Sequence, residues 1–473
     1  MAVEYDLVII GGGSAGLVVA SAAAQLKAKV ALVEKDRLGG DCLWAGCVPS
    51  KSLLEAGRVA HTVKNSVDYA VHSQLLTIDF KGVIDRVRGV IETIEPHDSQ
   101  SRFRNLGVEV IEGQGKFIDP KTFAVGGKKL TARAFVVATG SRPLIPPIID
   151  IETVGYVTNE QIFSLKQRPK CMVIVGGGPI ACELGQALHR LGVSITILVR
   201  GDHLLPKEDP EISAIIEHQF EAEGIGVMTR SNVRRVEKFG SRKHIWLEDE
   251  RLITDEVLIA TGRLPNVESL GLEAAKVKYD EAGVKVNSKL QTSNSKIYAC
   301  GDVIGGYKYT HVAGYEASIV VQNALFFPNK NVDYRVIPRA IFTQPEIAIV
   351  GLSEAEARQK HGDKVFILKQ DFTEVDRAQA AGKTEGFAKI ICLNNGQILG
   401  ANLIGESAGE LIHEIILAMR YRLPVSALSG IHVYPTLSEV NSKAALLLNK
   451  HKYAQNLNLQ KNLKGLFQFL RSL

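Results

Sequence analysis

Near its start the chain reads Tyr5-Asp6-Leu7-Val8-Ile9-Ile10, a β-rich run, and then Gly11-Gly12-Gly13-Ser14-Ala15-Gly16 before an apolar segment that extends to about Leu26. This is a G-x-G-x-x-G turn between a predicted strand and a predicted helix, and Val30–Glu34 is expected to form the next strand. The glycines of such a turn let the backbone approach a pyrophosphate, and the N-terminus of the following helix favours its negative charge. The pattern predicts a dinucleotide site.

The same pattern occurs a second time. A β-rich run precedes a second glycine turn, which a helix to about Leu191 and a further strand follow: Cys171–Val175, Gly176-Gly177-Gly178-Pro179-Ile180-Ala181 and Ser194–Val199. One glycine turn alone would be weak support for a nucleotide site, whereas two in a strand–turn–helix context are strong support. The repeat predicts an α/β fold with two Rossmann-like dinucleotide-binding domains.

Each half also contains a second landmark, a β-rich run that ends in Thr-Gly. The runs and their endings are Phe135–Ala138 before Thr139-Gly140 and Val257–Ala260 before Thr261-Gly262. The interval between turn and landmark is longer in the first half, so we expect an insertion there. The segment from Gly39 to about Asn105, with two helical stretches, is the candidate.

The end of the second strand distinguishes the two nucleotide sites. Glu34 ends that strand in the first half, where a carboxylate can accept hydrogen bonds from a ribose 2′-OH. The equivalent position in the second half is Val199, and Arg200 follows it. A missing acid beside an arginine favours a 2′-phosphate, and hence NADP over NAD. The alternative is that Arg200 is only a solvated residue at the end of a strand.

The pattern changes after Pro265. A short strand ends in Cys300-Gly301-Asp302, a helix follows from about His311 to Phe327, and four β-rich runs after Arg335 precede a helix from about Ser407 to Tyr421. No glycine turn occurs here, which indicates an α+β domain of another kind. The predicted organisation is 1–150 and 265–334 for the first nucleotide domain, 151–264 for the second, 335–453 for an α+β domain and 454–473 for a tail.

The most informative stretch is Gly39-Gly40-Asp41-Cys42-Leu43-Trp44-Ala45-Gly46-Cys47-Val48-Pro49-Ser50-Lys51. One helical turn can bring the two cysteines within disulfide range, and a helix is expected over Ser50–Arg58. Cysteines at a helix N-terminus have lowered pKa values, and Lys51 lies one turn after Cys47. This favours a redox-active pair. The alternatives are two buried structural cysteines or half of a metal site, although no second cysteine pair or Cys/His cluster completes a zinc set.

Composition excludes several classes of protein. Of 473 residues, 23% are charged and 45% hydrophobic, which is ordinary for a globular protein, and the net charge of +5 is not gathered into long basic runs. Nucleic acid is therefore not expected as a partner. The uncharged stretch from Leu7 to Leu26 contains three consecutive glycines and no basic segment precedes it, so neither a membrane span nor a signal peptide is expected. We expect a cytoplasmic protein.

These motifs together resemble those of the class I pyridine nucleotide-disulfide oxidoreductases, flavoproteins that include glutathione reductase, dihydrolipoamide dehydrogenase and mercuric reductase. The resemblance extends to about residue 450. It rests on the first glycine turn with Glu34, the cysteine pair with Val48-Pro49-Ser50-Lys51, Ala138-Thr139-Gly140, the second glycine turn with Glu183, Ala260-Thr261-Gly262-Arg263, and Cys300-Gly301-Asp302.

The resemblance implies FAD in the first site and NADPH or NADH in the second, where Val199 and Arg200 favour NADPH. Cys47 would be the charge-transfer thiolate against the flavin and Cys42 the interchange thiol, while Lys51 would pair with Glu183 near flavin N5 and Asp302 would bond the ribityl chain. The residues expected to hold FAD are Gly11, Gly13, Ser14, Ala15, Gly16, Glu34, Lys35, Gly40, Asp41, Lys51, Gly115, Thr139, Gly140 and Asp302. Those expected to hold the nicotinamide nucleotide are Gly176, Gly178, Ile180, Ala181, Arg200 and Gly262. The C-terminal domain would be a dimer interface that makes the protein a homodimer.

The sequence departs from the family at the acid–base group. Disulfide reductases of this family carry a His just before Pro-Thr and five residues before a Glu, whereas this chain has Tyr434 there, before Glu439. A phenol of pKa about 10 is a poor base near neutrality. His432, two residues upstream and on the same face if this segment is a strand, could substitute only if the loop shifted, and its alternative role is structural. Mercuric reductases also lack this His, but they carry a C-terminal cysteine pair, and this chain has no Cys after Cys392.

A tail follows the family core. Leu459, Leu463, Leu466, Phe467 and Leu470 recur at helical spacing among Lys461, Lys464 and Arg471, which predicts an amphipathic helix. It either packs on its own dimer or makes a weak contact with a membrane surface.

The sequence therefore predicts an FAD-dependent enzyme that passes electrons from NADPH through FAD and the Cys42–Cys47 pair to a small-molecule acceptor. A disulfide is the expected acceptor, and the alternative is a metal ion or quinone whose reduction does not need the His base. No resident metal is expected.

Overall fold

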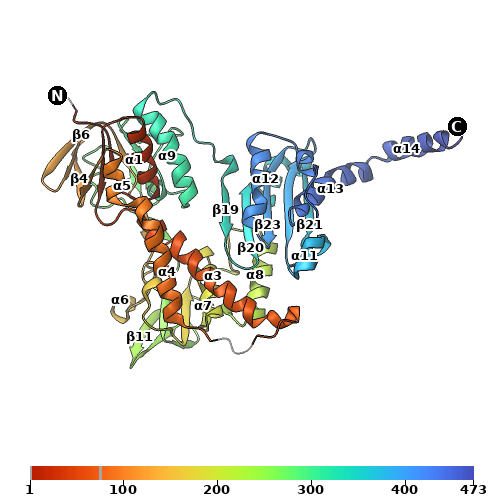
Figure 1. Cartoon of the computed structure of the whole chain (residues 1–473), viewed down its shortest axis with the longest axis horizontal. Coiled ribbons are helices and arrows are strands. Elements are labelled where there is room, and N and C mark those ends of the chain that lie inside the picture. Colours follow the sequence, from red (N-terminus) through yellow and green to blue (C-terminus); the bar gives the residue numbers. More distant parts are fainter. Residues whose placement is uncertain (1–2, 74–76) are drawn as a thin grey trace. The chain divides into compact units, whose positions relative to one another are not determined.

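The computed structural model describes residues 3–73 and 77–473, which form two compact units. One unit comprises residues up to 204 together with 223–333, and the other comprises 205–222 together with 334–473 (Figure 1). Each unit contains both helices and strands, in agreement with the predicted α/β class. No helix among the described residues is long and apolar enough to cross a membrane.

The first unit begins with a largely parallel sheet. Its strand order is β3-β2-β1-β6-β5-β4, and β18 pairs in parallel with β6. The parallel members are β1 (Tyr5–Ile10), β2 (Val30–Glu34), β3 (Val108–Glu112), β6 (Lys128–Val137) and β18 (Ile297–Ala299). An antiparallel extension consists of β4 (Gly115–Asp119) and β5 (Thr122–Val125). The strands predicted at Tyr5–Ile10 and Val30–Glu34 are confirmed.

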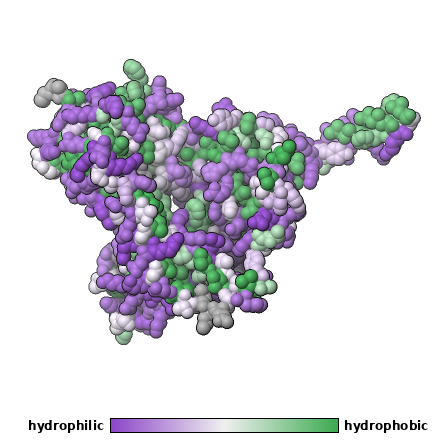
Figure 2. All heavy atoms as spheres, in the orientation of Figure 1, coloured by the Kyte–Doolittle hydropathy of each residue, from purple (hydrophilic) through white to green (hydrophobic). Residues whose placement is uncertain are grey.

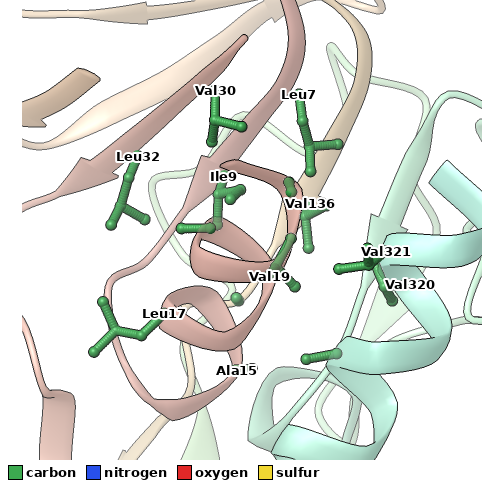
Figure 3. Packing of buried hydrophobic residues seen from close by; sticks show 14 of the residues in the cluster. Leu7, Ile9, Ala15, Leu17, Val19, Val30, Leu32, Val136, Val320 and Val321 are labelled. Carbon is green, nitrogen blue, oxygen red and sulfur yellow. The ribbon is translucent and has the colours of Figure 1, made fainter. Parts of the chain in front are cut away.

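Two helices cover one face of this sheet, α1 (Ser14–Gln25) and α9 (Thr310–Leu325). Figure 3 shows Ile9, Leu32 and Val136 of the sheet directed toward Val19 of α1, with Val320 of α9 beside them. All five are within one buried cluster. A run of small residues along α1 lets this helix lie close to both the sheet and α9, and the packing holds the first glycine turn at the carboxyl end of β1.

The predicted insertion is helical. It contains α2 (Gly40–Trp44), α3 (Cys47–Lys64), α4 (Phe80–Ile94) and α5 (Gln100–Asn105), with short 3₁₀ turns at Ser66–Tyr69 and Glu95–Asp98. Asp79 caps α4 by accepting a hydrogen bond from the Gly82 N–H. The apolar stripe of α4 is buried at helical spacing, through Phe80, Ile84, Val87 and Ile91.

A second parallel sheet repeats the first on a smaller scale. Its order is β10-β9-β8-β14, with β8 (Cys171–Val175), β9 (Ser194–Leu198), β10 (Gly226–Met228) and β14 (Glu256–Ile259). The helix α7 (Pro179–Arg190) follows the second glycine turn. Smaller elements complete the unit: α6 (Ile151–Val154), the antiparallel sheet β11 (Arg235–Phe239), β12 (Arg242–Trp246) and β13 (Arg251–Thr254), and the pairs β7 (Ser141–Pro143) with β15 (Arg263–Pro265) and β16 (Tyr279–Asp280) with β17 (Gly283–Val284).

The second unit has an antiparallel sheet of order β19-β20-β23-β22-β21. The strands are β19 (Pro338–Ile341), β20 (Glu346–Gly351), β21 (Val365–Asp371), β22 (Phe387–Leu393) and β23 (Ile398–Gly405). Its helices are α10 (Glu354–His361), α11 (Asp376–Ala381), α12 (Ala408–Arg420), α13 (Glu439–Gln455) and α14 (Leu457–Leu470), together with most of α8 (Pro210–Glu223). The sequence analysis did not identify β20, an inner strand of this sheet.

The segment 205–222 groups with the second unit, although the predicted boundaries place it within 151–264. The domain boundaries themselves remain a prediction.

Candidate functional site

The two glycine turns have the same local geometry. Gly11 and Gly176 adopt φ values of +106° and +129°, and a Cβ atom on either would lie 2.4 or 2.3 Å from the carbonyl oxygen of Ala138 or Ala260, respectively. Both alanines immediately precede the Thr-Gly landmarks. Each half of the repeat therefore brings its first glycine against its landmark, at the carboxyl ends of neighbouring parallel strands, where open α/β sheets bind ligands.

The first turn fits a dinucleotide. Gly13 caps α1, and a Cβ there would meet only the Cα of Gly40, at 3.8 Å, so two backbones without side chains border this helix N-terminus. Glu34 accepts hydrogen bonds from the backbone N–H of Gly12, at 2.6 Å, and of Asp36, at 2.9 Å. The carboxylate thus holds the turn and keeps further lone pairs for a ribose hydroxyl.

The other predicted FAD residues lie in different surroundings. Ser14 begins α1, Ala15 and Gly16 are buried within it, Lys35 is exposed, and Gly140 has open space where a side chain would stand. Thr139 exchanges hydrogen bonds with Asn266, through Thr139 Oγ1 to the Asn266 carbonyl and Asn266 Nδ2 to the Thr139 carbonyl. Gly115 begins β4, and a Cβ there would lie 2.3 Å from the ring of Phe123. Packing therefore explains Gly115 without a ligand, and its predicted role in nucleotide binding remains untested.

Asp41 and Asp302 are joined through an arginine. Arg263, 14% exposed, contacts Asp41 Oδ2 at 3.1 Å and Asp302 Oδ2 at 3.7 Å, and Ser141 Oγ donates to Asp302 Oδ2 at 2.6 Å. Burial raises the pKa of Asp41, against the opposing charge of Arg263. From the sequence, Arg263 was part of a motif and Ser141 was not a candidate. Their contacts join residues from α2, β7, β15 and the segment after β18, so no local pattern reveals them.

The redox pair lies at the junction of two helices. Cys42 is within α2, and Cys47 is the first residue of the 18-residue helix α3. Both are free thiols, and their side chains are in hydrogen-bond contact. Thr310, the first residue of α9, lies 3.2 Å from the Cys47 sulfur through its Oγ1 atom. Thr310 was not a sequence candidate, because it is 263 residues away in the chain.

The two thiols are electrostatically unequal. The hydrogen bond from Cys42, the contact with Thr310 and the charge of Lys51 together lower the pKa of Cys47 to about 6, against the effect of burial. The same hydrogen bond, with burial, raises the pKa of Cys42. Near neutrality the arrangement therefore stabilises a thiolate at Cys47 and a protonated thiol at Cys42.

Lys51 and Glu183 form an ion pair between α3 and α7. Lys51 Nζ donates to Glu183 Oε2 at 2.8 Å, and the Glu183 side chain is 9% exposed. Trp44, between the two cysteines, is held on two sides: its Nε1 donates to the Leu38 carbonyl at 2.7 Å, and the Arg37 guanidinium lies 3.9 Å from its ring centroid. These contacts support a packing role for Trp44.

The second turn fits a dinucleotide. Gly178 caps α7 with open space where a Cβ would stand, Pro179 and Ile180 begin the helix, and Ala181 is buried. At Gly262, an added Cβ would lie 3.6 Å from the side chain of Leu144. Arg200 is exposed just after β9, and within the described residues no side chain pairs with it.

The acid–base candidates lie in the second unit, where Tyr434 and His432 are bonded to other residues of that unit. Residues 431–438 are not a strand, so the condition that placed His432 on the face of Tyr434 is not met. Tyr434 OH donates to Asp376 Oδ2 at 2.8 Å, and this hydrogen bond raises the pKa of Tyr434. Both ring nitrogens of His432 contact oxygens, Nδ1 that of Gly430 at 2.9 Å and Nε2 that of Glu414 at 3.2 Å. Glu439 begins α13, and its buried Oε2 atom has no hydrogen-bond partner among the described residues.

No group of three or more His, Cys, Asp or Glu side chains that could hold a metal ion occurs in residues 3–73 and 77–473.

Comparison with known proteins gives concordant matches along the chain. Residues 5–317 match the model of the pyridine nucleotide-disulphide oxidoreductases, and residues 337–445 match the dimerisation domain of the same family. A mercuric reductase of Staphylococcus aureus is 36% identical over 455 residues, which cover 94% of this chain and 83% of that protein. A dihydrolipoyl dehydrogenase of Chlamydia pneumoniae is 35% identical over 457 residues, covering 95% and 98%.

Among solved structures, a Cu(II) complex of the HOCl-induced flavoprotein disulfide reductase RclA from Escherichia coli matches with a TM-score of 0.85 and 28% identity, covering 94% of this chain and all of that one. Members of this family are FAD-dependent enzymes that use NAD(P)H, carry a redox-active disulfide and form homodimers through the dimerisation domain. The two glycine turns, the paired thiols and these matches together show that the chain belongs to the pyridine nucleotide-disulphide oxidoreductase family.

Proposed function

We infer that the protein is an NADPH-dependent reductase in which Cys42 and Cys47 pass two electrons to a small disulfide. The observation that carries this proposal is the asymmetry of the thiol pair, with the pKa of Cys47 lowered to about 6 and that of Cys42 raised. When bound, FAD supplies the step from a two-electron hydride donor to the thiols. Gly13, Glu34, Asp41 and Asp302 hold FAD in this proposal.

The two thiols then have separate roles. Cys42 attacks the substrate disulfide, its S–S bond breaks, and a mixed disulfide and one substrate thiolate form. Cys47 attacks the Cys42 sulfur, which releases the second substrate thiol and restores the Cys42–Cys47 disulfide. Overall, NADPH, one proton and one disulfide give NADP⁺ and two thiols. Lys51 stabilises the negative charge on Cys47, and Glu183 holds Lys51.

A second candidate acceptor is a metal ion or a quinone, and the contacts of Tyr434 favour it. The attacking thiol must lose a proton and the leaving thiol must gain one, but Tyr434 is bonded to Asp376 and His432 to Glu414. Acceptors that do not release a thiol need no such transfer. Mercuric reductases are among the relatives, and the RclA structure is a Cu(II) complex, which supports testing both metals.

The test is the rate of NADPH oxidation by the purified holoenzyme with oxidised glutathione, lipoamide, Hg²⁺, Cu²⁺ and a soluble quinone. Turnover that requires both cysteines, measured with Cys42→Ser and Cys47→Ser, supports the reductase. Fast reduction of a small disulfide supports the first candidate, whereas slow disulfide reduction beside fast metal or quinone reduction supports the second. No cysteine-dependent turnover with any acceptor overturns both.

The preference for NADPH rests on the residues that follow β9 and β10. Val199 leaves this strand end without an acid, and Arg200 is exposed beside it. Arg230 follows the neighbouring strand, its backbone N–H donates to the Gly201 carbonyl at 2.9 Å, and its Nε donates to Asp202 at 2.7 Å. Two guanidinium groups therefore lie after neighbouring parallel strands, where a 2′-phosphate could be bound by charge-assisted hydrogen bonds.

Arg200→Glu should lower the ratio of kcat/KM for NADPH to that for NADH by about 10- to 100-fold, since it replaces a charge-assisted bond with repulsion. Arg251→Glu, which makes the same change at an exposed residue of β13, should leave the ratio unchanged. Wild-type protein that uses NADH at least as well as NADPH would show that the reading of this strand end is wrong.

Proposals about the partners and the location of the protein rest on the sequence. We propose a small-molecule acceptor, no nucleic acid partner, a cytoplasmic location and a membrane-surface contact of the C-terminal tail.

A further inference from the structure

We propose that α14 is a lipid-binding helix that lies in the plane of an anionic phospholipid surface. The inference deepens the tail contact included in the proposed function by naming its partner, and it does not depend on the reaction catalysed.

The apolar residues of α14 are exposed, apart from Leu463, which is partly buried. The helix runs from Leu457 to Leu470, is capped by Asn456, whose Oδ1 accepts from the Leu459 N–H at 2.9 Å, and has no buried residue. Leu466, Phe467, Phe469 and Leu470 are 49%, 55%, 59% and 52% exposed. Figure 2 shows hydrophobic residues gathered along this C-terminal helix. Contiguous exposed apolar surface of this kind marks an interaction site.

One face of the helix is apolar, and its basic side chains lie away from that face. Leu459, Leu463, Leu466, Phe467 and Leu470 recur at spacings of three and four residues, which places them on one face. Lys461, Lys464 and Arg471 fall on the other side, together with Gln468 and Leu457. This is the pattern of helices that bury an apolar face at a lipid interface while long basic side chains reach the headgroups.

The positive charge of the tail favours an anionic lipid surface as the partner of α14. Residues 440–473 contain no Asp or Glu, and their basic residues are Lys443, Lys450, Lys452, Lys461, Lys464 and Arg471. A second copy of the tail would bring like charges together and offers no carboxylate to pair with them. Anionic headgroups offer the complementary charge, and basic segments next to an apolar face are attracted to such lipids.

The length of α14 decides between spanning and lying on the membrane. A helix of 14 residues is about 21 Å long at 1.5 Å per residue, shorter than the roughly 30 Å hydrocarbon core. The preceding helix α13 is anchored in the core of the second unit by Val440, Ala444, Ala445 and Leu448. The folded unit and the lipid-binding helix are therefore consecutive, joined at Asn456.

The experiment is vesicle flotation of the full-length FAD-bound protein. Vesicles of equal parts phosphatidylcholine and phosphatidylglycerol should carry the wild type upward, whereas phosphatidylcholine alone should carry at least about tenfold less, because the electrostatic attraction is lost. Raising the salt concentration should weaken the binding to the anionic vesicles.

Two leucines of α14 provide a matched pair of variants. Leu466→Ser removes an exposed side chain from the apolar face and should reduce flotation about tenfold, since interfacial binding scales with the apolar area that is buried. Leu457→Ser removes a leucine that is 66% exposed on the opposite side and should leave flotation unchanged. Light scattering should give the same oligomeric state for both variants and the wild type.

The proposal is overturned if the wild-type protein floats with neither kind of vesicle. It is also overturned if the protein floats equally well with both kinds. Equal flotation of Leu466→Ser and Leu457→Ser also overturns the proposal. A changed oligomeric state of Leu466→Ser overturns it as well, because that result would assign the apolar face to a second copy of the chain. The NADPH oxidation assay is run on the same samples. Flotation without turnover would contradict the reductase function alone, and turnover without flotation would contradict the lipid-binding helix alone.

Discussion

At the scale of single residues, the redox pair depends on neighbours that are remote in sequence. The hydrogen bond from Cys42 and the charge of Lys51 lower the pKa of Cys47, and both residues are close to Cys47 in the chain. Thr310 comes from the start of α9 and adds a contact at 3.2 Å. Because the lowered pKa of Cys47 combines local and distant contributions, each can be removed separately.

The alkylation of Cys47 in the reduced holoenzyme should follow a pH profile with a midpoint of about 6, since only the thiolate reacts. Thr310→Ala should move the midpoint upward and slow alkylation at pH 6 by about threefold to tenfold, because a hydrogen bond to the thiolate is lost. The measurement is the rate of iodoacetamide incorporation at Cys47 by mass spectrometry. A wild-type midpoint near the ordinary thiol value, or a Thr310→Ala profile identical to that of the wild type, would contradict this prediction.

Substitution of Tyr434 tests whether the lack of a histidine base at this position limits disulfide turnover. Its hydroxyl is bonded to Asp376 and its pKa is raised, so it holds its proton near neutrality. Tyr434→His should raise the turnover of oxidised glutathione, by up to about 10²- to 10⁴-fold, with little change for a quinone acceptor. Tyr421→His, at another exposed tyrosine of the same unit, is the matched control and should give no gain. Fast disulfide turnover by the wild type would instead point to His432, and its loss in His432→Ala would establish that role.

At the scale of secondary-structure elements, the close contact of α3 with α7 places Lys51 against Glu183. Gly57 is at the crossing point, where an added Cβ would lie 3.1 Å from both the Cα and the carbonyl oxygen of Ala187. Gly89 of α4 has nothing within 4 Å of the same atom. Two glycines inside neighbouring helices therefore differ only in what faces them, and only the first is required by packing.

Gly57→Val should destabilise the protein by about 1–3 kcal/mol, because α7 backbone must move to accommodate the side chain. Gly89→Val should change stability by less than about 0.5 kcal/mol, since valine is at least as good a helix former as glycine. The readout is the thermal midpoint of the holoenzyme, with a decrease of several degrees expected for Gly57→Val alone. Equal effects of the two substitutions would show that the crossing is not tight.

At the scale of the whole molecule, each of the two units consists of two segments that are separated in the sequence. Residues 205–222 belong with 334–473, where Lys389 of β22 contacts Asp209, at 2.8 Å, and also Glu211. The Lys389 side chain is 2% exposed. Lys369 of β21 contacts the same Glu211 from an exposed position. The buried lysine thus ties a segment from the middle of the chain to the C-terminal sheet.

Lys389→Met should destabilise the second unit by about 3–5 kcal/mol, because Asp209 is left buried without its partner. Lys369→Met, the same change at a surface pair, should cost less than about 1 kcal/mol. Both are measured by urea denaturation of the holoenzyme. Similar costs for the two variants would contradict the role given to Lys389.

The same ion pairs give a pH dependence. Burial raises the pKa of Glu211, but hydrogen bonds from Lys369 and Lys389 outweigh it, so the pKa is lowered overall. A carboxyl whose pKa is lowered on folding stabilises the native state above its unfolded value of about 4.3, and this contribution is lost as the pH falls through the folded value. The difference in stability between wild type and Lys389→Met should therefore shrink below about pH 4.

The sequence by itself determined the features that depend on neighbouring residues. The two glycine turns, the strands Tyr5–Ile10 and Cys171–Val175, a helix over Ser50–Arg58 and the amphipathic tail were all predicted, because each requires only the spacing of residues within one element. The observed helix α3 is longer and begins at Cys47. The repeat of one turn at Gly11 and Gly176 extended this local information to the fold class, since both turns must meet the ends of parallel strands.

Only the tertiary structure decided which distant residues meet. It brought Thr310 to Cys47, linked Asp41 to Asp302 through Arg263, and directed Tyr434 to Asp376 and His432 to Glu414. It also revealed β20 and the grouping of residues 205–222 with the C-terminal unit. The physical reason is that periodicity records which side of an element is apolar, whereas the partner of a polar side chain is set by how the elements pack, and one sequence carries no direct record of that choice.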